Sequence, residues 1–348
     1  MDEIKSCSQR TEEEELVEQH FQQNHYRDKG GVFVVEMPLK EEFKEIGSSR
    51  ETALRRFTYL ERRLEKNEQM KNAYVQKMRE SIQLGHVQVA ARSPHHCIEK
   101  KFRIVYDASC RTNRGISLND IQMLGEKLQR DLHDIIMRFR RHRIAICADI
   151  KKMFNQVRLN KEQWDLQRIF WRENRYEQLK EYWLTVVTFG LTSSAHLAVR
   201  SVLQAAKEAK HNYPQAANAI KNDFYIDDCA TGETDEKKAI QLEKEMYEIL
   251  KGAGFELSQW KSNSKRFMAE LHSGTVDPTM VFSGEEKSSI LGLKWLIVLD
   301  QFTYEVKTPR LVGILTKRKV VSCVAQLYDP NGYISPVTVI GKIIIQDI

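Results

Sequence analysis

The chain has 348 residues and a formal net charge of +6, with 41% hydrophobic and 29% charged residues. A chain of this length can bury a large core and is expected to divide into two or three lobes. Its mild basicity permits a polyanionic partner without requiring one. The six cysteines show no CxxC spacing, which predicts neither a zinc site nor a disulfide framework and fits a reducing compartment.

Neither end of the sequence predicts export or a membrane. The opening Met1-Asp2-Glu3-Ile4-Lys5 lacks the apolar core of a signal peptide, so we expect a protein that is not secreted. The apolar stretch from Ile334 to Ile345 is too short to cross a bilayer and contains Lys342. Residues 1–15 are acidic and polar and are predicted to be a disordered start.

The first half of the chain predicts a strand at residues 31–38 and a long helix after Ser48 or Ser49. Four arginines on that helix are expected to be solvated, with contact to a nucleic-acid template as the alternative: Arg55, Arg56, Arg62 and Arg63. In Pro94-His95-His96-Cys97 we expect a structural role rather than a metal site, because adjacent histidines do not easily chelate one ion.

A short apolar run from Ile144 to Ile150 predicts a buried strand that carries Asp149 near its end. Asp149 is either a site residue or an acid paired with Lys151 or Lys152. Seven cations between Arg138 and Arg158, against this single acid, indicate either a solvated basic surface or a track for phosphates.

The run Asp223 to Ala230 is expected to form a β-hairpin with Asp227 and Asp228 at its tip and Thr231-Gly232 as turn residues. Two adjacent carboxylates repel each other unless a cation is present, and Mg²⁺ prefers carboxylate oxygens. The alternative is a solvated turn. The elements around the acids predict an α+β fold in which helices pack on one face of an antiparallel sheet.

These motifs together resemble a known family. Asp149, followed 78 positions later by Tyr225-Ile226-Asp227-Asp228, is similar to motifs A and C of reverse transcriptases. More narrowly, the chain resembles the reverse transcriptase of BEL/Pao long-terminal-repeat retrotransposons. The further matching blocks are Phe102 to Ser109, Ser117 to Asp120, Ala148 to Phe154, Thr188 to Ser194 and Leu291 to Trp295.

The resemblance implies a right-hand polymerase with fingers, palm and thumb. Residues 16–147 would be the N-terminal segment and fingers and residues 148–265 the palm. Residues 266–348 would be the primer grip, the thumb and the truncated start of the connection, leaving no room for a ribonuclease H domain. The implied cofactor is a pair of Mg²⁺ ions, with Mn²⁺ possible, held by Asp149, Asp227 and Asp228.

The resemblance also implies roles for other residues. Lys261 is similar to a motif D lysine that protonates pyrophosphate, with a surface lysine as the alternative. Phe154 would exclude a 2′-hydroxyl unless it is simply a core residue, and this gate argues against an RNA-templated RNA polymerase. The implied deoxynucleotide contacts are Lys101, Arg103, Ile150, Lys151, Lys152, Met153, Phe154, Phe189 and Gly190. The implied primer grip is Leu291, Gly292 and Leu293.

The predicted function is RNA-directed DNA synthesis from deoxynucleoside triphosphates on an RNA or DNA template, with a DNA or tRNA primer. The resemblance implies a cytoplasmic, virus-like-particle setting and a larger polyprotein with protease, ribonuclease H and integrase. The alternative is an inactive or co-opted retroelement fragment that binds nucleic acid without catalysis.

Overall fold

The computed structural model describes residues 10–40, 46–90, 98–100, 103–271, 287–303 and 316–347. The chain forms two compact units, which are interleaved along the sequence. The first comprises residues 1–128, 152–208 and 249–256, and the second comprises residues 129–151, 209–248 and 257–348. In the described part of the chain, no helix combines the length and the hydropathy needed to cross a bilayer.

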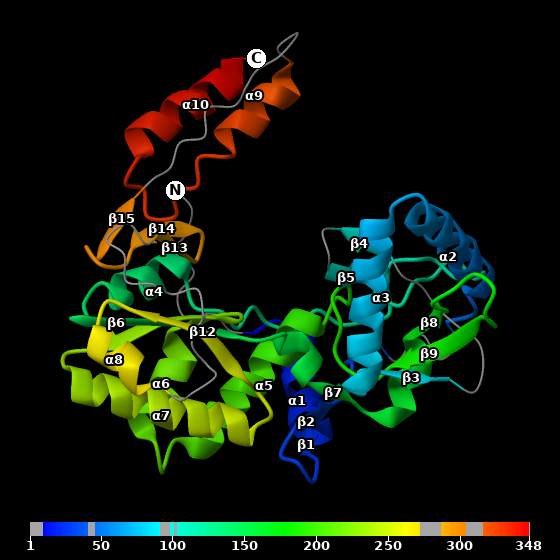
Figure 1. Cartoon of the computed structure of the whole chain (residues 1–348), viewed down its shortest axis with the longest axis horizontal. Helices are drawn as coiled ribbons and strands as arrows, with labels where there is room; N and C mark the ends of the chain where they lie inside the picture. Colours follow the sequence, from blue (N-terminus) through cyan, green and yellow to red (C-terminus); the bar gives the residue numbers. More distant parts are fainter. Residues whose placement is uncertain are drawn as a thin grey trace. The chain divides into compact units, whose positions relative to one another are not determined.

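The first unit contains three small sheets (Figure 1). Their strands are β1 (Tyr26–Arg27), β2 (Phe33–Val35) and β7 (Arg158–Leu159); β3 (Val87–Val89), β9 (Lys180–Leu184) and β8 (Arg168–Trp171); and β4 (Ile98–Lys100) with β5 (Arg103–Val105). Its helices are α1 (Glu12–Asn24), α2 (Arg50–Glu65), α3 (Glu68–Gln83), the 3-10 helices η1 (Met153–Gln156) and η2 (Lys161–Leu166), and α5 (Ser194–Ala209).

Helices α2 and α3 replace the single long helix that the sequence predicted. Asn67 separates them and caps α3, because its side chain accepts a hydrogen bond from the Met70 amide. The apolar stripe of α2 packs with Tyr74 and Met78 of α3 against β8 and β9. The predicted periodicity is therefore confirmed, and the interruption comes from a capping residue.

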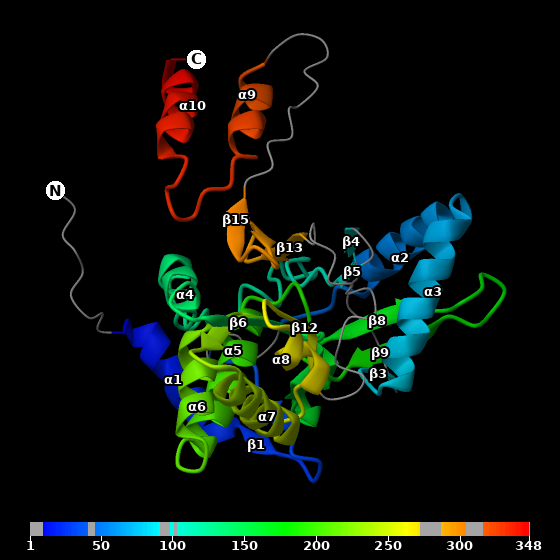
Figure 2. The ribbon, with the colours of Figure 1, turned by 60° about the vertical axis from the view of Figure 1, so that its left-hand side comes forward.

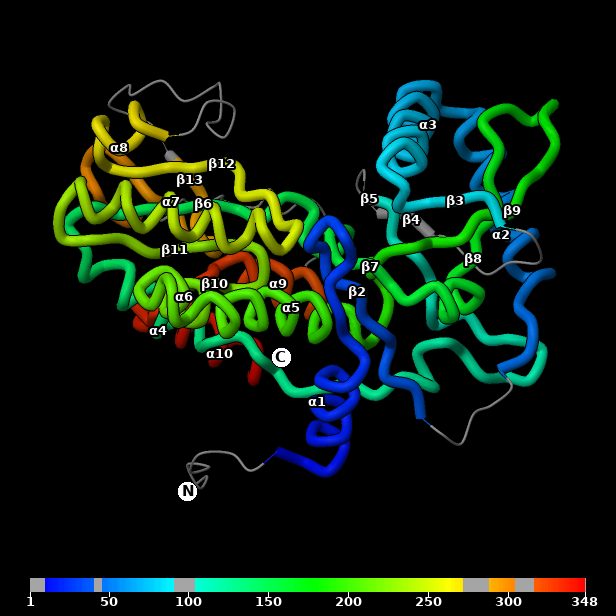
Figure 3. Tube along the Cα trace, turned by 90° about the horizontal axis from the view of Figure 1, so that it is seen from below, coloured from blue at the N-terminus to red at the C-terminus, as the bar shows by residue number. Residues whose placement is uncertain are grey.

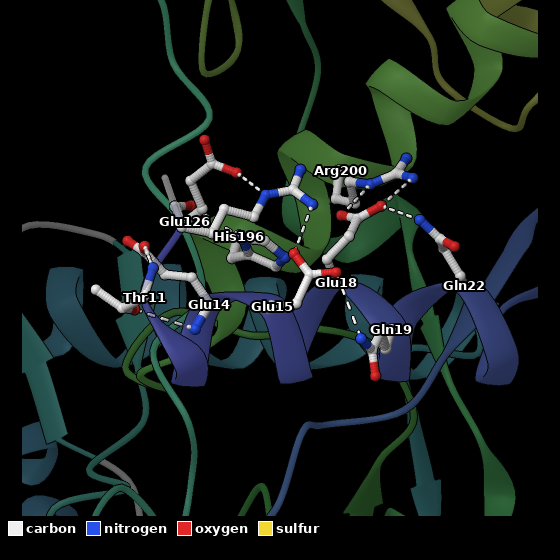
Figure 4. Close-up of polar contacts among 10 residues, drawn as sticks. Thr11, Glu14, Glu15, Glu18, Gln19, Gln22, Glu126, His196 and Arg200 are labelled. Atoms are coloured by element: carbon white, nitrogen blue, oxygen red, sulfur yellow. Dashed lines mark hydrogen bonds and ion pairs between the residues drawn. The ribbon is translucent and has the colours of Figure 1, made fainter. Parts of the chain in front are cut away.

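Helix α1 corrects the prediction of a disordered start in its described part, residues 10–15. Thr11 and Glu14 form a capping box at the beginning of the helix. Buried Glu18 receives two hydrogen bonds from Arg200 of α5, at 2.9 and 2.8 Å (Figure 4). Arg10 also reaches Glu126 at 2.8 Å. Within residues 10–15, acidic Glu14 therefore caps a helix instead of belonging to a disordered start.

The second unit is built on a four-stranded antiparallel sheet in the order β10-β11-β6-β12 (Figure 3). Its strands are β10 (Phe224–Tyr225), β11 (Asp228–Glu233), β6 (Ile144–Ile150) and β12 (Leu257–Ser262), followed by a separate sheet of β13 (Lys287–Ile290), β14 (Leu293–Leu296) and β15 (Gln301–Thr303). Its helices are α4 (Leu132–Phe139), α6 (Pro214–Asn222), α7 (Glu236–Gly252), α8 (Lys265–Glu270), α9 (Lys317–Val324) and α10 (Ser335–Asp347).

Helices cover both faces of the four-stranded sheet, not one face as the sequence suggested. Helices α6 and α7 lie on one side and α4 lies on the other (Figures 1 and 2). On the α4 side, Phe139 packs edge to face on fully buried Trp295 of β14, with ring centroids 5.4 Å apart. One apolar core thus joins α4, the sheet and the β13–β14 hairpin.

Candidate active site

The strand register brings the three predicted acids to one end of the sheet. Asp149 of β6 lies directly opposite Asp228 of β11. Directly opposed residues of antiparallel strands have Cα atoms roughly 4.5–5.5 Å apart. The carbonyl oxygen of Asp227 accepts a hydrogen bond of 2.8 Å from the Ile150 amide, which fixes the hairpin tip beside β6. Residues 79 positions apart in the sequence are thereby neighbours.

The same register decides which residues share the face of Asp149. Cys147 lies opposite Ala230 on β11 and opposite Lys261 on β12. Because side chains alternate along a strand, these residues lie on the face of Asp149 and Asp228. Cys147 and Ala230 belong to the core formed with α4 and the β13–β14 hairpin. The acids therefore lie on the same face of the sheet, beyond its buried residues, where Asp228 is exposed to solvent.

The tip of the acidic hairpin adopts an unusual backbone conformation. Tyr225 pairs with Asp228, so the turn consists of Ile226 and Asp227. Ile226 has φ of 60°, whereas Asp227 is not in the positive-φ region. Positive φ at the first turn position alone is typical of a type II′ turn, which normally has glycine there. A β-branched residue in this region is strained, and such strain gathers at functional sites.

Asp223 anchors the base of this hairpin. Its buried carboxylate accepts hydrogen bonds of 2.8 Å from Arg138 Nε and from Thr231 Oγ1. Its carbonyl oxygen accepts the Ala230 amide at 2.9 Å. The prediction that Thr231-Gly232 form the turn is therefore wrong, because both residues lie inside β11. Threonine at this position supplies a buried hydroxyl instead.

The electrostatics of the face are dominated by the adjacent acids. Partial withdrawal from water and the charge of Asp227 raise the pKa of Asp228, and the ammonium of Lys261 opposes this rise. More than a third of Asp228 remains exposed, so water damps the effect. Burial raises the pKa of Cys147 and Cys229, which keeps both thiols neutral, as suits small core residues.

The carboxylates of Asp149, Asp227 and Asp228 are the type of ligand that a hard cation prefers, but their side chains do not form a complete ligand group. Within the ranges that the structure describes, no three His, Cys, Asp or Glu side chains are arranged to hold a metal ion. Register and turn place the backbones of Asp149, Asp227 and Asp228 together, and burial and the charge of Asp227 raise the pKa of Asp228. Carboxylates with uncompensated charge fit a divalent cation.

Lys261 is held at the edge of this face by a bulge and by a partner residue. Ser258 pairs with Asp149 and Lys261 pairs with Cys147, so two residues of β12 oppose one residue of β6. Gln259 takes φ of 54°, and the side chain of Trp260 is fully buried. Lys261 Nζ then donates a hydrogen bond of 2.8 Å to Ser288 Oγ. Sequence reasoning identified Lys261 but missed Ser288.

The predicted primer-grip residues form the turn between β13 and β14. Ile290 pairs with Leu293, which leaves Leu291 and Gly292 as the two turn residues. Both have positive φ, 49° and 86°, as in a type I′ hairpin. Buried Leu291 and Leu293 belong to the core beneath the acids. The Leu-Gly pair is the sequence signal for this turn.

In the first unit, two predicted nucleotide contacts meet. Phe154 of η1 and Phe189 pack as tilted rings with centroids 4.6 Å apart. Phe154 is buried, which agrees equally with its alternative role as a core residue. Gly190 has φ of 111°, and a Cβ there would lie 1.9 Å from the carbonyl oxygen of Tyr106. Only glycine allows this close approach.

Asn119 holds the loop that contains Gly190, a role that sequence reasoning missed. Its amide nitrogen donates to Gly190 O at 2.9 Å and to Ser109 Oγ at 2.8 Å. Its side-chain oxygen accepts the Thr192 amide at 3.0 Å. Asn119 belongs to one of the matching sequence blocks, so the block was visible while its contacts were not.

The strand–helix turn after Asp149 contains several of the residues expected to contact the nucleotide. The Ile150 amide already donates to Asp227, so it is not available to a phosphate. Lys152 takes φ of 50° and η1 begins at Met153, a geometry that favours anion-binding nests. The predicted contact of Lys151 with the deoxynucleotide stays a prediction. Lys101, and the side chain of Arg103, lie outside the described residues.

The basic run from Arg138 to Arg158 is largely paired within the protein. Arg138 binds Asp223 and Arg140 binds Asp300 in the second unit. Lys152 binds Glu80 and Arg158 binds Asp28 in the first unit. These ion pairs involve four of the seven cations and favour a structural use of those four over a continuous phosphate track.

Comparisons with known proteins agree with this geometry. The family profile described as "Reverse transcriptase (RNA-dependent DNA polymerase)" matches residues 66–295. A second, described as "Pao retrotransposon-like RNaseH-like domain", matches residues 316–348, the region of α9 and α10, so the expectation that residues 266–348 leave no room for ribonuclease H sequence is wrong there. No significant match is found among curated proteins.

A solved structure of a foamy viral enzyme shares the fold, and a second is reported beside it. The protease-reverse transcriptase in complex with an RNA/DNA hybrid has a TM-score of 0.51 and 14% identity, covering 75% of this chain and 31% of that chain. The enzyme in complex with double-stranded DNA gives 0.49 and 15%, covering 74% and 47%. This chain thus spans less than half the length of these relatives. It belongs to the reverse transcriptase family, with the BEL/Pao retrotransposon character that its motifs indicated.

Proposed function

We propose that this chain catalyses RNA-directed DNA synthesis by transferring a nucleotide from a deoxynucleoside triphosphate to a primer 3′-hydroxyl. The observation that carries the proposal is the direct pairing of Asp149 with Asp228, beside the strained turn that presents Asp227. Three carboxylates at one end of a sheet are the donor set that polymerases use for two-metal phosphoryl transfer.

Asp149, Asp227 and Asp228 would hold two Mg²⁺ ions, with Mn²⁺ as an alternative. When bound, these ions would favour ionisation of the primer 3′-hydroxyl and stabilise the leaving pyrophosphate. The strained Ile226 turn and the Asp223 anchor would keep the acidic tip in place during the reaction. Rigid support of this kind reduces the reorganisation that catalysis requires.

Lys261 would protonate the leaving pyrophosphate as a general acid. Its hydrogen bond to Ser288 holds the ammonium on the acidic face, where its charge acts on Asp228. Phe154 and Phe189 would line the nucleotide site and exclude a 2′-hydroxyl, with Gly190 allowing close backbone approach. Lys101, Arg103, Lys151, Lys152 and Met153 would contact the triphosphate, and Leu291, Gly292 and Leu293 would contact the primer.

The expected nucleic-acid partners are an RNA or DNA template and a DNA or tRNA primer. Two of the similar foamy viral structures are complexes with double-stranded DNA and one is a complex with an RNA/DNA hybrid. The Pao-type match at residues 316–348 supports a place within a larger polyprotein. Such a polyprotein would also supply protease, ribonuclease H and integrase.

Primer extension on an RNA template tests the proposal. Purified protein is incubated with an annealed DNA primer, deoxynucleotides and Mg²⁺. Asp149→Asn should reduce extension by more than about 100-fold, because loss of even outer-shell partners of a metal ligand costs 10–100-fold. Asp235→Asn is the matched control: this exposed acid lies in the same unit and keeps its acceptor oxygen for the Lys238 amide. A folded wild-type chain that extends no primer would show the proposal to be wrong.

A second candidate function is binding of nucleic acid without catalysis. It is favoured by the finding that, in the described part of the chain, no three acidic, His or Cys side chains are grouped for a metal. Under this alternative, binding would weaken with salt, Asp227→Asn would not alter it, and no extension product would form.

A further inference from the structure

Helix α2 in the first unit has one buried face and one strongly basic face. Ala53, Phe57, Leu60 and Leu64 face the core with β8 and α3. At 100° per residue, the opposite side carries five exposed residues within an arc of about 100°. These residues, here called the α2 basic face, are Arg55, Tyr59, Arg62, Arg63 and Lys66.

The neighbouring acids do not neutralise this face. Glu61 binds Arg172 through two hydrogen bonds of 2.6 and 2.8 Å, and Glu65 pairs with Arg175 at 3.4 Å. Within the described ranges, Arg62, Arg63 and Lys66 form no ion pair, and Arg55 donates only to the Thr52 hydroxyl. Acids lie near the two ends of the face, at positions 51 and 68.

Other arginines of the same unit show that pairing is the usual arrangement. Arg79 binds Glu173 through two hydrogen bonds, and Arg50 pairs with Glu181 at 3.4 Å. The α2 basic face therefore holds four positive charges close together, while the neighbouring acids Glu61 and Glu65 bind other arginines. An array of like charges is unfavourable in isolation and gains most from a polyanionic partner.

An aromatic side chain lies within the charges. Tyr59 is 70% exposed, one turn after Arg55 and one turn before Arg62 and Arg63. Cations that follow a backbone, with an aromatic ring between them, are the combination that binds single strands, because a base can stack on the ring. A membrane surface fits poorly, since the apolar side of α2 is already buried in the core.

We propose that the α2 basic face binds single-stranded nucleic acid through its phosphates, with one base stacked on Tyr59. The identification of this strand as template rests on the proposed polymerase function. Binding of the strand itself does not require catalysis.

Fluorescence anisotropy with a labelled 20-nucleotide single-stranded RNA tests the proposal, without nucleotides, across a salt series. The variant R55Q/R62Q/R63Q/K66Q removes four charges. Each lost phosphate contact reduces the slope of log affinity against log salt by about 0.7, so the slope should fall by about three. The dissociation constant should rise at least tenfold. A matched control, K237Q/K238Q/K244Q/K251Q, removes four exposed charges from α7 and should change it less than twofold.

Substitutions of Tyr59 provide the second part of the binding experiment. Tyr59→Ser should weaken single-strand binding about tenfold, since a stacked base contributes about 1–3 kcal/mol, and Tyr59→Phe should bind like the wild type. The proposal is overturned if the α2 and α7 charge variants bind alike, if Tyr59→Ser has no effect, or if a duplex of equal length competes as well as the single strand. Loss of primer extension with α2-dependent binding intact would reject only the polymerase function.

Discussion

Two hairpins of the second unit have two-residue turns that differ in residue type. Both reverse the chain with two residues, Ile226-Asp227 between β10 and β11 and Leu291-Gly292 between β13 and β14. The second uses glycine where φ is most positive, at 86°. The first places isoleucine at φ of 60° and an acid beside it. The comparison teaches that both turns place a side chain at positive φ, but the second gives its most positive position to glycine, whereas the acidic turn places a β-branched residue at its positive-φ position.

The largest effect on stability is expected from removing the glycine of the second hairpin. In Gly292→Ala, a Cβ would lie 2.6 Å from the ring of Tyr328 and the φ of 86° would become strained. We expect the free energy of unfolding to fall by about 2 kcal/mol. Gly332→Ala is the control, because its φ is 73° but the nearest atom is a serine hydroxyl at 3.0 Å. If denaturant titrations show that Gly292→Ala and Gly332→Ala lose the same free energy of unfolding, the clash with Tyr328 contributes nothing to the loss.

A smaller effect of opposite sign is expected at the acidic tip. Ile226→Gly removes the strain of a β-branched residue at positive φ, and it also loses a partly buried side chain. We expect the free energy of unfolding to rise by up to about 1 kcal/mol. Primer extension should fall, because a more flexible tip holds Asp227 less firmly. A variant that is both less stable and fully active would contradict the strain argument.

The smallest effect is expected from the charge of Asp228. Its folded pKa is raised, so the charged form destabilises the folded state above the ordinary aspartate pKa, and stability falls as pH rises through the folded pKa. Asp228→Asn should therefore stabilise the protein at pH 7 by less than about 1 kcal/mol, since more than a third of the residue is exposed to water. Thermal unfolding should show this gain disappearing below about pH 4. A gain that persists at low pH would point to another cause.

Much of the candidate site was predictable from local patterns. An apolar run of seven residues ending near Asp149 can hardly be anything but a buried strand, and Asp227-Asp228 after an aromatic and a β-branched residue marks a hairpin. Gly190 and Gly292 were predicted as a nucleotide contact and a primer-grip residue, but their positive φ values were not predicted. Trp260 and Trp295 are both fully buried packing residues.

Other features depended on partners far away in the sequence. The pairing of Asp149 with Asp228, the hydrogen bond from Lys261 to Ser288 and the ion pair of Arg200 with Glu18 each join distant segments. Thr231 and Gly232 look like turn residues, yet the Asp223 anchor draws Thr231 into a strand. Local preference is worth a few tenths to about 1 kcal/mol per residue, so tertiary contacts override it.

The sequence by itself determined which side chains carry the chemistry and in what order they occur, because residue type and short-range periodicity are properties of the chain. Only the tertiary structure decided that the acids oppose one another in register and that most cations of the central run are already paired, while the α2 basic face is left unpaired. These outcomes follow from burial and ion pairing between segments far apart in the sequence. Local sequence preferences alone do not distinguish between the possible strand registers and ion-pair partners.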